Sequence, residues 1–267
     1  MDKKLTIIFI IILILGGITG AYFYLFSKNQ EKKATWTDPL LLKIKEEGKI
    51  VFGTEASYPP MENIDENGNF VGIDIEIAKE IAKDLGVKAE FKNIPFDTIF
   101  DKVNNGEVDA AISAITITPE RIEKLLFSDP YFNAGQVILT LSNRNDISGQ
   151  GSLYNKKVGV QSNTTSFLEA QKYVKSDLIV QYESYDLAKK DLLENKIDAI
   201  LIDFPAALSA VSENKNFKIV GEPFTQEFYG IAVRKDSTAL LNEINKTIRR
   251  LKIENRLEEI INKWLRK

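Results

Sequence analysis

The sequence of 267 residues contains no cysteine and no histidine. Without cysteine, the chain can form no disulfide, no thiolate nucleophile and no cysteine metal site. Without histidine, it lacks the commonest general base and the commonest ligand of transition metals. Any catalysis would therefore depend on carboxylates, lysine, tyrosine or hydroxyl groups, and we expect no resident metal ion or cofactor.

A strong excess of either charge is also missing. The 35 Lys and Arg residues nearly balance 38 Asp and Glu residues, which leaves a net charge of -3. The charges are spread along the chain without a basic stripe, so we expect no nucleic-acid partner. Hydrophobic residues make up 44% of the chain, which is typical of globular proteins with ample cores.

A long uncharged run near the N-terminus predicts a membrane-spanning helix. Leu5–Phe26 has 22 residues, follows Lys3 and Lys4, and as a helix would span about 33 Å, enough for a bilayer core of ~30 Å. The run is longer than the apolar region of a signal peptide, and the cleavage site at Thr19–Ala21 is poor. We therefore predict an uncleaved signal anchor and a polar tether over residues 1–35, with a cleaved signal peptide as the alternative.

Beyond this segment, strands alternate with helices, which predicts an α/β fold with mainly parallel sheets. Apolar spacing and a glycine stop predict one helix over Ile73–Leu85, for example. The predicted strands are 49–54, 88–93, 108–113, 136–141, 157–161, 178–182, 198–202 and 228–234. The first predicted helix begins at Thr37–Pro39 and ends at Gly48. The other predicted helices cover 73–85, 96–104, 119–125, 165–174, 185–194, 205–211 and most of 237–266.

Two stretches of the chain repeat each other. Residues 96–112 match residues 185–201 with a constant offset of 89, and residues 51–55 match 157–161 in the same order. We interpret the two halves as two versions of one βαβ lobe. Because open α/β sheets bind ligands beyond the carboxyl ends of their strands, two facing lobes would bring four loops into one cleft. These loops are 55–61, 113–121, 161–166 and 203–205.

The four loops carry side chains that suit a small zwitterion. Arg121 presents planar donors for a carboxylate, and Thr165 lies at a helix start, where N–H groups favour anions. Asp203 ends an apolar strand and could receive an ammonium group. Ordinary alternatives remain: Arg121 pairs with Glu120, the threonine is a simple cap, and Asp203 caps the helix at Pro205.

Acidic and aromatic side chains lie near the same loops. Tyr58 is predicted to form a wall of the cleft, whereas Phe96 either lines it or packs in the core. Glu55 and Asp74 could face the side chain of a ligand, which favours a basic one. The sequence at Asp65–Gly68 suggests a calcium loop but lacks the distal glutamate, so we interpret it as a turn.

A set of motifs carries a resemblance to a known family. They are Gly53–Met61, Val71–Glu76, Gly106–Ala111, Thr116–Arg121, Phe127–Tyr131, Val158–Gln161, Tyr229–Arg234 and Lys263-Trp264. With them the chain, over nearly all of Lys49–Leu265, resembles the extracytoplasmic solute-binding proteins of polar amino-acid ABC importers. That group includes the glutamine-, histidine- and arginine/lysine-binding proteins.

The resemblance implies a two-lobe periplasmic-binding-protein fold of type II, with two mixed, mostly parallel sheets joined by two crossover strands. Lobe one would comprise residues 36–134 and 226–267, and lobe two residues 135–225. The implied function is not enzymatic: a monomer on the extracytoplasmic face of the membrane binds a polar L-amino acid, of which a basic one is favoured. It then delivers this ligand to the permease subunits of an ABC transporter by hinge closure. A dehydratase acting on prephenate-like acids, with Glu55 as its acid, and a sensory domain are the alternatives.

The resemblance also implies roles for residues that bind the backbone of the ligand. Arg121 would grip the α-carboxylate, and Thr165 would donate to it. The α-ammonium would be met by the Ala114 carbonyl, the Thr116 hydroxyl and the Asp203 carboxylate.

Further roles implied by the resemblance concern the side chain of the ligand. Tyr58 and Phe96 would sandwich it, and Glu55 would touch its polar end. The chain departs from the family at Asn163, where glycine is usual, and at Met61, where phenylalanine is common. Asn163 is expected to need φ > 0, which asparagine tolerates better than most residues.

Overall fold

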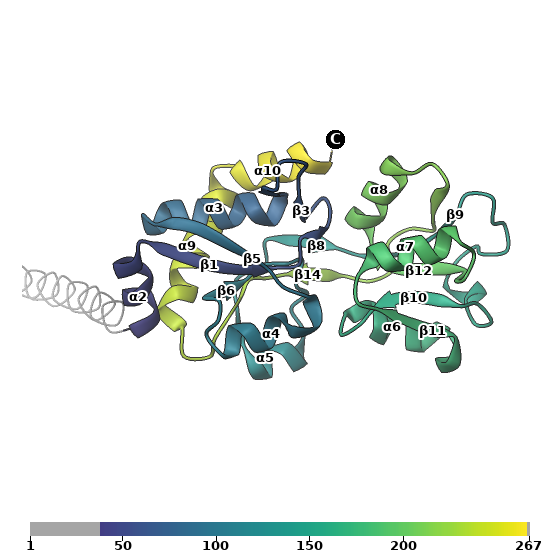
Figure 1. Ribbon diagram of the computed structural model, residues 1–267, viewed down its shortest axis with the longest axis horizontal. Coiled ribbons are helices and arrows are strands. Elements are labelled where there is room, and N and C mark those ends of the chain that lie inside the picture. Colours follow the sequence, from purple (N-terminus) through teal and green to yellow (C-terminus); the bar gives the residue numbers. More distant parts are fainter. Residues whose placement is uncertain (1–37, 266–267) are drawn as a thin grey trace, which may run out of the picture.

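The computed structural model describes residues 38–265, which form two lobes side by side (Figure 1). In these residues each lobe has a five-stranded sheet in which four strands run in one direction and one runs against them. The prediction of two mixed sheets is therefore confirmed. The first sheet has the order β5 (Lys88–Asn93), β1 (Lys49–Thr54), β6 (Ala110–Ala111), β15 (Ala232–Val233) and β7 (Leu126–Phe127). The second has the order β11 (Ile179–Tyr182), β10 (Val158–Gln161), β12 (Ala199–Asp203), β9 (Gln136–Leu141) and β13 (Phe217–Val220).

Helices form where capping residues and apolar spacing predict them. Asp38 accepts the Leu40 N–H at 2.9 Å and begins α2 (Pro39–Glu47), which Gly48 ends in the left-handed conformation. The apolar stripe of α3 (Ile73–Leu85) is buried against the first sheet. The other helices are α4 (Phe96–Asn104), α5 (Pro119–Lys124), α6 (Thr165–Tyr173), α7 (Tyr185–Leu193), α8 (Phe204–Glu213), α9 (Thr238–Ile253), α10 (Arg256–Leu265) and the short η1 (Gln150–Ser152) and η2 (Ser176–Leu178).

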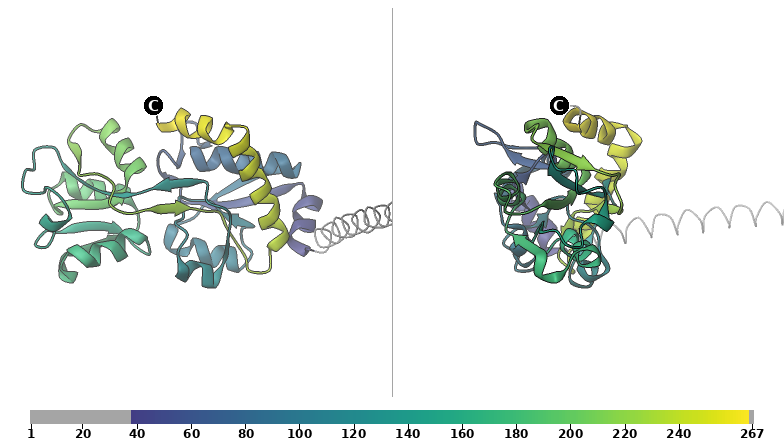
Figure 2. Two further views of the ribbon diagram at one scale, coloured as in Figure 1. Left: turned by 180° about the vertical axis from the view of Figure 1, so that it is seen from behind. Right: turned by 90° about the vertical axis from the view of Figure 1, so that its right-hand side faces the viewer.

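Two strands carry the chain between the lobes (Figure 2). β8 (Phe132–Ala134) leads into the second sheet, and β14 (Glu227–Tyr229) returns from it, paired antiparallel with β8. Beside them, a Cβ added to Gly135 would lie 2.6 Å from the Thr225 carbonyl oxygen. Glycine is therefore required where the two crossings pack together. Both strands lie where crossover strands were expected, while the limits of the lobes in sequence stay a prediction.

The internal repeat corresponds to equivalent positions in the two sheets. β1 lies between β5 and β6 in the first sheet, as β10 lies between β11 and β12 in the second. Helices α4 and α7 begin at Phe96 and Tyr185, which are 89 residues apart, and they precede the equivalent strands β6 and β12. The two matches in the sequence thus report two copies of one strand–helix–strand arrangement.

The structure differs from the sequence prediction where contacts between distant segments determine the bounds of strands and helices. The single strand predicted over 228–234 is wrong, because β14 pairs with β8 and β15 joins the first sheet beside β6. The loop over 55–71 contains an unpredicted sheet of β2 (Ser57–Tyr58), β3 (Glu62–Ile64) and β4 (Phe70–Val71). The C-terminal helix is divided by Asn255, which has a φ of 57°.

Within residues 38–265, no helix has the length and apolar character needed to cross a membrane. The predicted membrane helix and tether, residues 1–35, lie outside the described residues.

Candidate functional site

The four strand-end loops meet in one cavity between the lobes, with about 360 Å³ not filled by atoms. The cavity is lined by every site residue predicted from the sequence: Glu55, Tyr58, Phe96, Ala114, Thr116, Arg121, Thr165 and Asp203. It is also lined by six further residues: Glu62, Ser113, Gln161, Thr164, Ser166 and Tyr185.

Arg121 lies on α5, which begins with Thr118 as N-cap and Pro119 in its first turn, as predicted. Its Nη1 donates to the Thr116 carbonyl at 2.8 Å, and its Nη2 reaches across the cleft to the Asn163 carbonyl at 3.0 Å. The guanidinium also stacks on Phe96, 5.4 Å from the ring centroid. Contacts to both lobes and to an aromatic face hold the guanidinium plane at the cavity wall.

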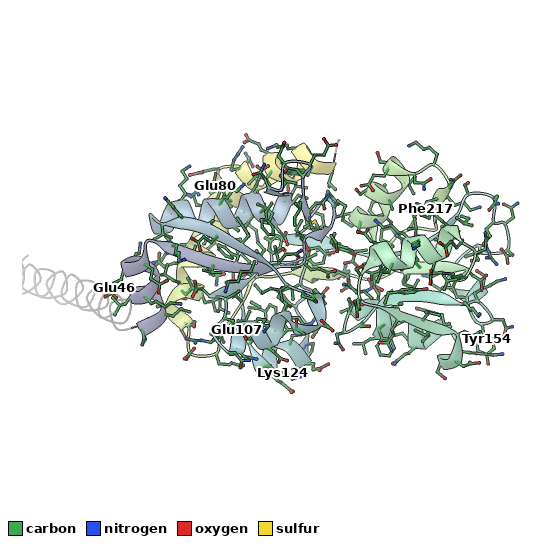
Figure 3. All side chains as sticks on the ribbon, viewed as in Figure 1. Glu46, Glu80, Glu107, Lys124, Tyr154 and Phe217 are labelled. Carbon is green, nitrogen blue, oxygen red and sulfur yellow. The ribbon has the colours of Figure 1, made fainter. Side chains whose placement is uncertain are left out.

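The expectation that Glu120 could neutralise Arg121 is wrong. The Glu120 carboxylate pairs with Lys124 at 3.5 Å, and Lys124 lies at the outer edge of the lobe (Figure 3). Among residues 38–265, no ion pair involves Arg121. Burial lowers the pKa of Arg121 to about 10, although the charges of Glu227, Glu120 and Asp203 oppose this shift. The side chain therefore stays cationic at neutral pH and can bind an anion in the cavity.

Asp203 faces the cavity from the end of β12. It occupies the N-cap position of α8, but in the described part of the chain its side chain makes no capping hydrogen bond. The interpretation of Asp203 as a helix cap is therefore wrong: its Oδ2 accepts the hydroxyl of Tyr229 instead. Its Oδ1 is buried without a partner among residues 38–265. Burial raises the pKa of Asp203 to about 7, so a cation at Oδ1 would stabilise the ionised form.

The N-terminus of α6 forms a second anion-favouring wall. The N-cap residue Thr164 donates its hydroxyl to the Gln161 carbonyl at 2.7 Å and, within the described chain, caps no helix N–H with its side chain. The alternative that Thr165 is a simple cap is therefore wrong: Thr165 lies in the first turn, Thr164 occupies the N-cap position without capping, and first-turn N–H groups can serve a ligand. Gln136 donates to the Thr165 hydroxyl oxygen at 3.0 Å, which leaves that hydroxyl proton for another acceptor. Asn163, just before the helix, has the expected positive φ, 59°.

Ala114 and Thr116 lie on the turn after β6. Ala114 has a φ of 46°, and its N–H donates to Asp74 Oδ2 at 2.8 Å. The backbone of Thr116 forms a bridge with Tyr229 and accepts from Arg121. The expectation that Asp74 faces a ligand side chain is wrong, because Asp74 is 0% exposed behind this turn.

Glu55 is the acidic residue that does line the cavity. Its carboxylate accepts from Ser57 at 3.0 Å and, across the cleft, from Gln161 at 2.6 Å. Burial raises its pKa, and these two hydrogen bonds oppose the shift. A cationic or amide group of a ligand is a suitable partner for such a carboxylate.

Aromatic side chains close the remaining walls. The Tyr58 hydroxyl accepts the Asp203 N–H at 3.3 Å, and its ring lies 5.3 Å from that of Tyr185. Tyr185 was missed from the sequence, although it is the repeat equivalent of Phe96. Each of the two residues begins the helix that precedes the central strand of its sheet, β6 or β12. The repeat was therefore the signal that could have identified it.

In residues 38–265, no group of three acidic side chains could hold a metal ion. The suggested calcium loop is a turn, as interpreted from its sequence. Asp65 Oδ1 accepts the N–H groups of Asn67 at 2.9 Å and Asn69 at 2.8 Å. These internal bonds occupy the carboxylate that a cation would need.

Comparisons with known proteins point to one family. Its model, bacterial extracellular solute-binding proteins, family 3, matches residues 50–267. The chain is 35% identical to the ABC transporter glutamine-binding protein of Bacillus subtilis (strain 168) over 245 residues, covering 90% of this chain and 88% of that protein. Its structure is similar to a mutant of ArgBP from T. maritima, with a TM-score of 0.81, 37% identity and coverage of 85% and 100%. It is also similar to an ancestral arginine-binding protein bound to glutamine, with a TM-score of 0.78, 42% identity and coverage of 81% and 97%.

The curated relatives are named as binding proteins and not as enzymes, which confirms the predicted non-enzymatic function. The family description also confirms that the chain acts outside the cytoplasm.

Proposed function

Because the chain belongs to the bacterial extracellular solute-binding proteins of family 3, we propose that it captures a polar L-amino acid between its lobes. It then delivers this ligand to the permease of an ABC importer. Amino-acid binding and partnership with an ABC transporter follow from the family. The identity of the ligand and the delivery step are the proposed parts.

One observation carries the proposal: Arg121, a half-buried cation without an ion pair in the described chain, lines the same cavity as Asp203, which has an unpartnered carboxylate oxygen. An α-amino acid carries both complementary charges on neighbouring atoms. Its carboxylate binds Arg121, Thr165 and the first turn of α6. Its ammonium binds Asp203, the Ala114 carbonyl and the Thr116 hydroxyl.

The side chain of the ligand extends between Tyr58 and Phe96 toward Glu55. A guanidinium or amide group would donate to this carboxylate, which favours arginine and glutamine over acidic amino acids. The relatives named for glutamine and arginine support the same pair of candidates.

Ligand capture is coupled to closure of the lobes. Side chains of one lobe already contact the other through the Arg121–Asn163 and Glu55–Gln161 hydrogen bonds. A ligand that bridges both walls stabilises this closed arrangement over an open one, and only differential contacts can shift the equilibrium. The closed monomer then docks on the permease, and the N-terminal run over 5–26 holds it at the membrane.

A thermal-shift panel of the twenty amino acids on the purified chain tests the proposal. Arginine or glutamine should raise the melting temperature in a concentration-dependent way, because binding stabilises the native state by mass action. D-arginine is the matched control. When its carboxylate and ammonium bind the two walls, its side chain cannot point in the direction that the L-enantiomer's takes. An unchanged melting temperature with all twenty amino acids would contradict the proposed function.

A further inference from the structure

Two acidic side chains lie together at one wall of the cavity: Glu62 on β3, which lines it, and Asp74 on α3, which lies behind it. They are 1% and 0% exposed. The Asp74 N–H donates to the carbonyl of Met61, the residue before Glu62, at 2.9 Å, and the two carboxyl groups accept from the neighbouring residues Ser113 and Ala114, so they lie together. Burial raises the pKa of both groups, that of Asp74 to about 6, and the charge of Asp74 further raises that of Glu62. Two carboxylates can only accept hydrogen bonds, so such a pair is satisfied only when one of them is protonated.

The free oxygens of the two groups agree with this arrangement. Glu62 Oε2 and Asp74 Oδ1 are buried and have no donor among the residues that the structure describes. A proton held between the carboxyl groups would give both of these oxygens a hydrogen-bond partner. It also leaves one negative charge in the pair instead of two.

The other oxygens of the pair hold the turn after β6. Glu62 Oε1 accepts the Ser113 hydroxyl at 2.8 Å, and the Ser113 oxygen accepts the Glu55 N–H at 2.9 Å. Asp74 Oδ2 accepts the Ala114 N–H at 2.8 Å and the Tyr131 hydroxyl at 2.9 Å. Ala114 has a φ of 46°, which residues other than glycine rarely adopt. The turn therefore depends on these acceptors for its conformation.

We propose that Glu62 and Asp74 form a buried carboxyl pair that holds one proton and thereby positions the Ser113–Ala114 turn for ligand binding. The ligand part of this inference rests on the function proposed above. Loss of the proton would leave two facing carboxylates in a buried site, which repel each other. That repulsion would displace Ser113 and Ala114, which line the cavity.

Besides burial, the charges of Asp74 and of Glu55, on the loop after β1, raise the pKa of Glu62, whereas the hydrogen bond from Ser113 lowers it. Tyr58 on β2 and Tyr131 before β8 also face Glu62, and burial and the charge of Glu62 raise the pKa of both, so they stay neutral. Because the folded pKa of Glu62 is raised, its stabilising effect is fully present below the pKa of an unfolded glutamate, about 4.3. This effect is lost as the pH rises through the folded pKa.

Glu62→Gln is the main test, because its amide oxygen can accept from Ser113 and its N–H can replace the shared proton. Denaturant unfolding of the ligand-free full chain is measured between pH 5 and pH 9. In the wild type the unfolding equilibrium constant should rise with pH more steeply than in the variant, by up to about tenfold per pH unit. The matched control Glu66→Gln, on the exposed Asp65–Gly68 turn, should follow the wild type. A Glu62→Gln profile parallel to the wild type would overturn the shared proton.

A carboxyl ¹³C NMR titration of the wild type gives the same answer if the variant does not fold. The Glu62 resonance should titrate far above the ordinary glutamate range. Titration near the pKa of a free glutamate would overturn the proposal.

The positioning role is tested by calorimetry with L-arginine and L-glutamine as probes. Asp74→Ala should weaken binding about tenfold, since it removes a buried hydrogen-bond acceptor. Asp74→Asn keeps an acceptor for the Ala114 N–H and should restore most of the affinity. Equal weakening by both variants would refute positioning. Failure of the wild type to bind either probe would instead contradict the proposed function, and the unfolding experiment would still decide on the shared proton.

Discussion

The two lobes share one arrangement of strands and helices and differ at the ends of equivalent strands. Ala114 follows β6 in the first lobe, and Asp203, 89 residues later, ends β12 in the second. Ala114 has no polar side chain, and its backbone is held by Asp74 from behind. Asp203 instead places its own carboxylate at the cavity. The same scaffold thus supplies a backbone acceptor on one wall and a charged acceptor on the other.

The anion-favouring elements differ in the same way. The first lobe uses a side chain, Arg121, whereas the second uses the N-terminus of α6. A zwitterion bound as proposed would contact all four elements only when the lobes are together. The comparison therefore teaches that divergence of two similar halves can create a site that neither half contains alone.

The largest expected effect comes from removing the cation of the first lobe. Arg121→Ala should weaken amino-acid binding by ~2–5 kcal/mol, because the ligand carboxylate loses its buried partner. Isothermal titration calorimetry with L-arginine measures the change. Lys124→Ala, also on α5 but exposed, is the control and should bind like the wild type. Near-native affinity of Arg121→Ala would show that α6 alone holds the carboxylate.

The carboxylate of the second lobe should make binding dependent on pH. Since the pKa of Asp203 is about 7, wild-type affinity should fall about tenfold per pH unit below that value, where the group must lose a proton to bind ammonium. Asp203→Asn should bind more weakly at pH 8 and lack this dependence. Calorimetry between pH 5 and pH 8 measures both, and a pH-dependent Asn variant would contradict the assignment.

In the absence of ligand, Asp203→Asn should be more stable than the wild type. The folded pKa of Asp203 is raised above that of an unfolded aspartate, about 3.9, so its stabilising effect is lost as the pH rises from about 4 to about 7. Asp203→Asn avoids this loss and should gain on the order of 1–4 kcal/mol at pH 8. Denaturant unfolding at pH 5 and pH 8 measures the difference. An Asn variant less stable than the wild type at pH 8 would refute it.

A smaller effect is expected where the equivalent aromatic residues differ. Tyr185→Phe gives the second lobe the ring that Phe96 provides in the first, and removes the bond from its hydroxyl to Ser166 at 3.0 Å. We expect a loss of ~0.5–1.5 kcal/mol in unfolding free energy. Tyr182→Phe, whose hydroxyl bonds Asp191 at a more exposed site, should lose less. The reverse order would contradict the role of burial.

The smallest effect concerns the left-handed residue before α6. Asn163→Gly should change the unfolding free energy by less than about 1 kcal/mol, because glycine adopts φ > 0 readily. Asn163→Ala should be less stable than the glycine variant by about 1 kcal/mol. Thermal unfolding of both variants measures this order. An alanine variant as stable as the glycine variant would show that the left-handed conformation is not required.

Much of the fold was predictable because its signals are local. The helix over Ile73–Leu85 and the strands over 49–54 and 88–93 have the predicted bounds, since apolar spacing and glycine stops define them within a few residues. Arg121, Thr165 and Asp203 followed from strand ends and from the repeat, whereas Ala114 and Thr116 were implied by the resemblance to the family. Their assembly into one cavity could be expected because parallel strands end at one edge.

The missed features depend on partners distant in sequence. Asp74 could not be assigned, because its burial results from contacts with Ala114 and Tyr131, 40 and 57 residues away. The division of the predicted strand after Tyr229 arises because β14 pairs with β8 whereas β15 pairs with β6. No pattern within a short window distinguishes these partners from others.

The two crossings described for β8 and β14 have a practical consequence for protein engineering. All of the second sheet and its helices come from one uninterrupted stretch of chain, between Gly135 and Thr225. A chimera joined at these two points would exchange one wall of the cavity as a cassette, with Thr165, Tyr185 and Asp203 transferred together. Ligand preference could thus be recombined wall by wall, provided that the first junction keeps Gly135, which packs against Thr225 at the second.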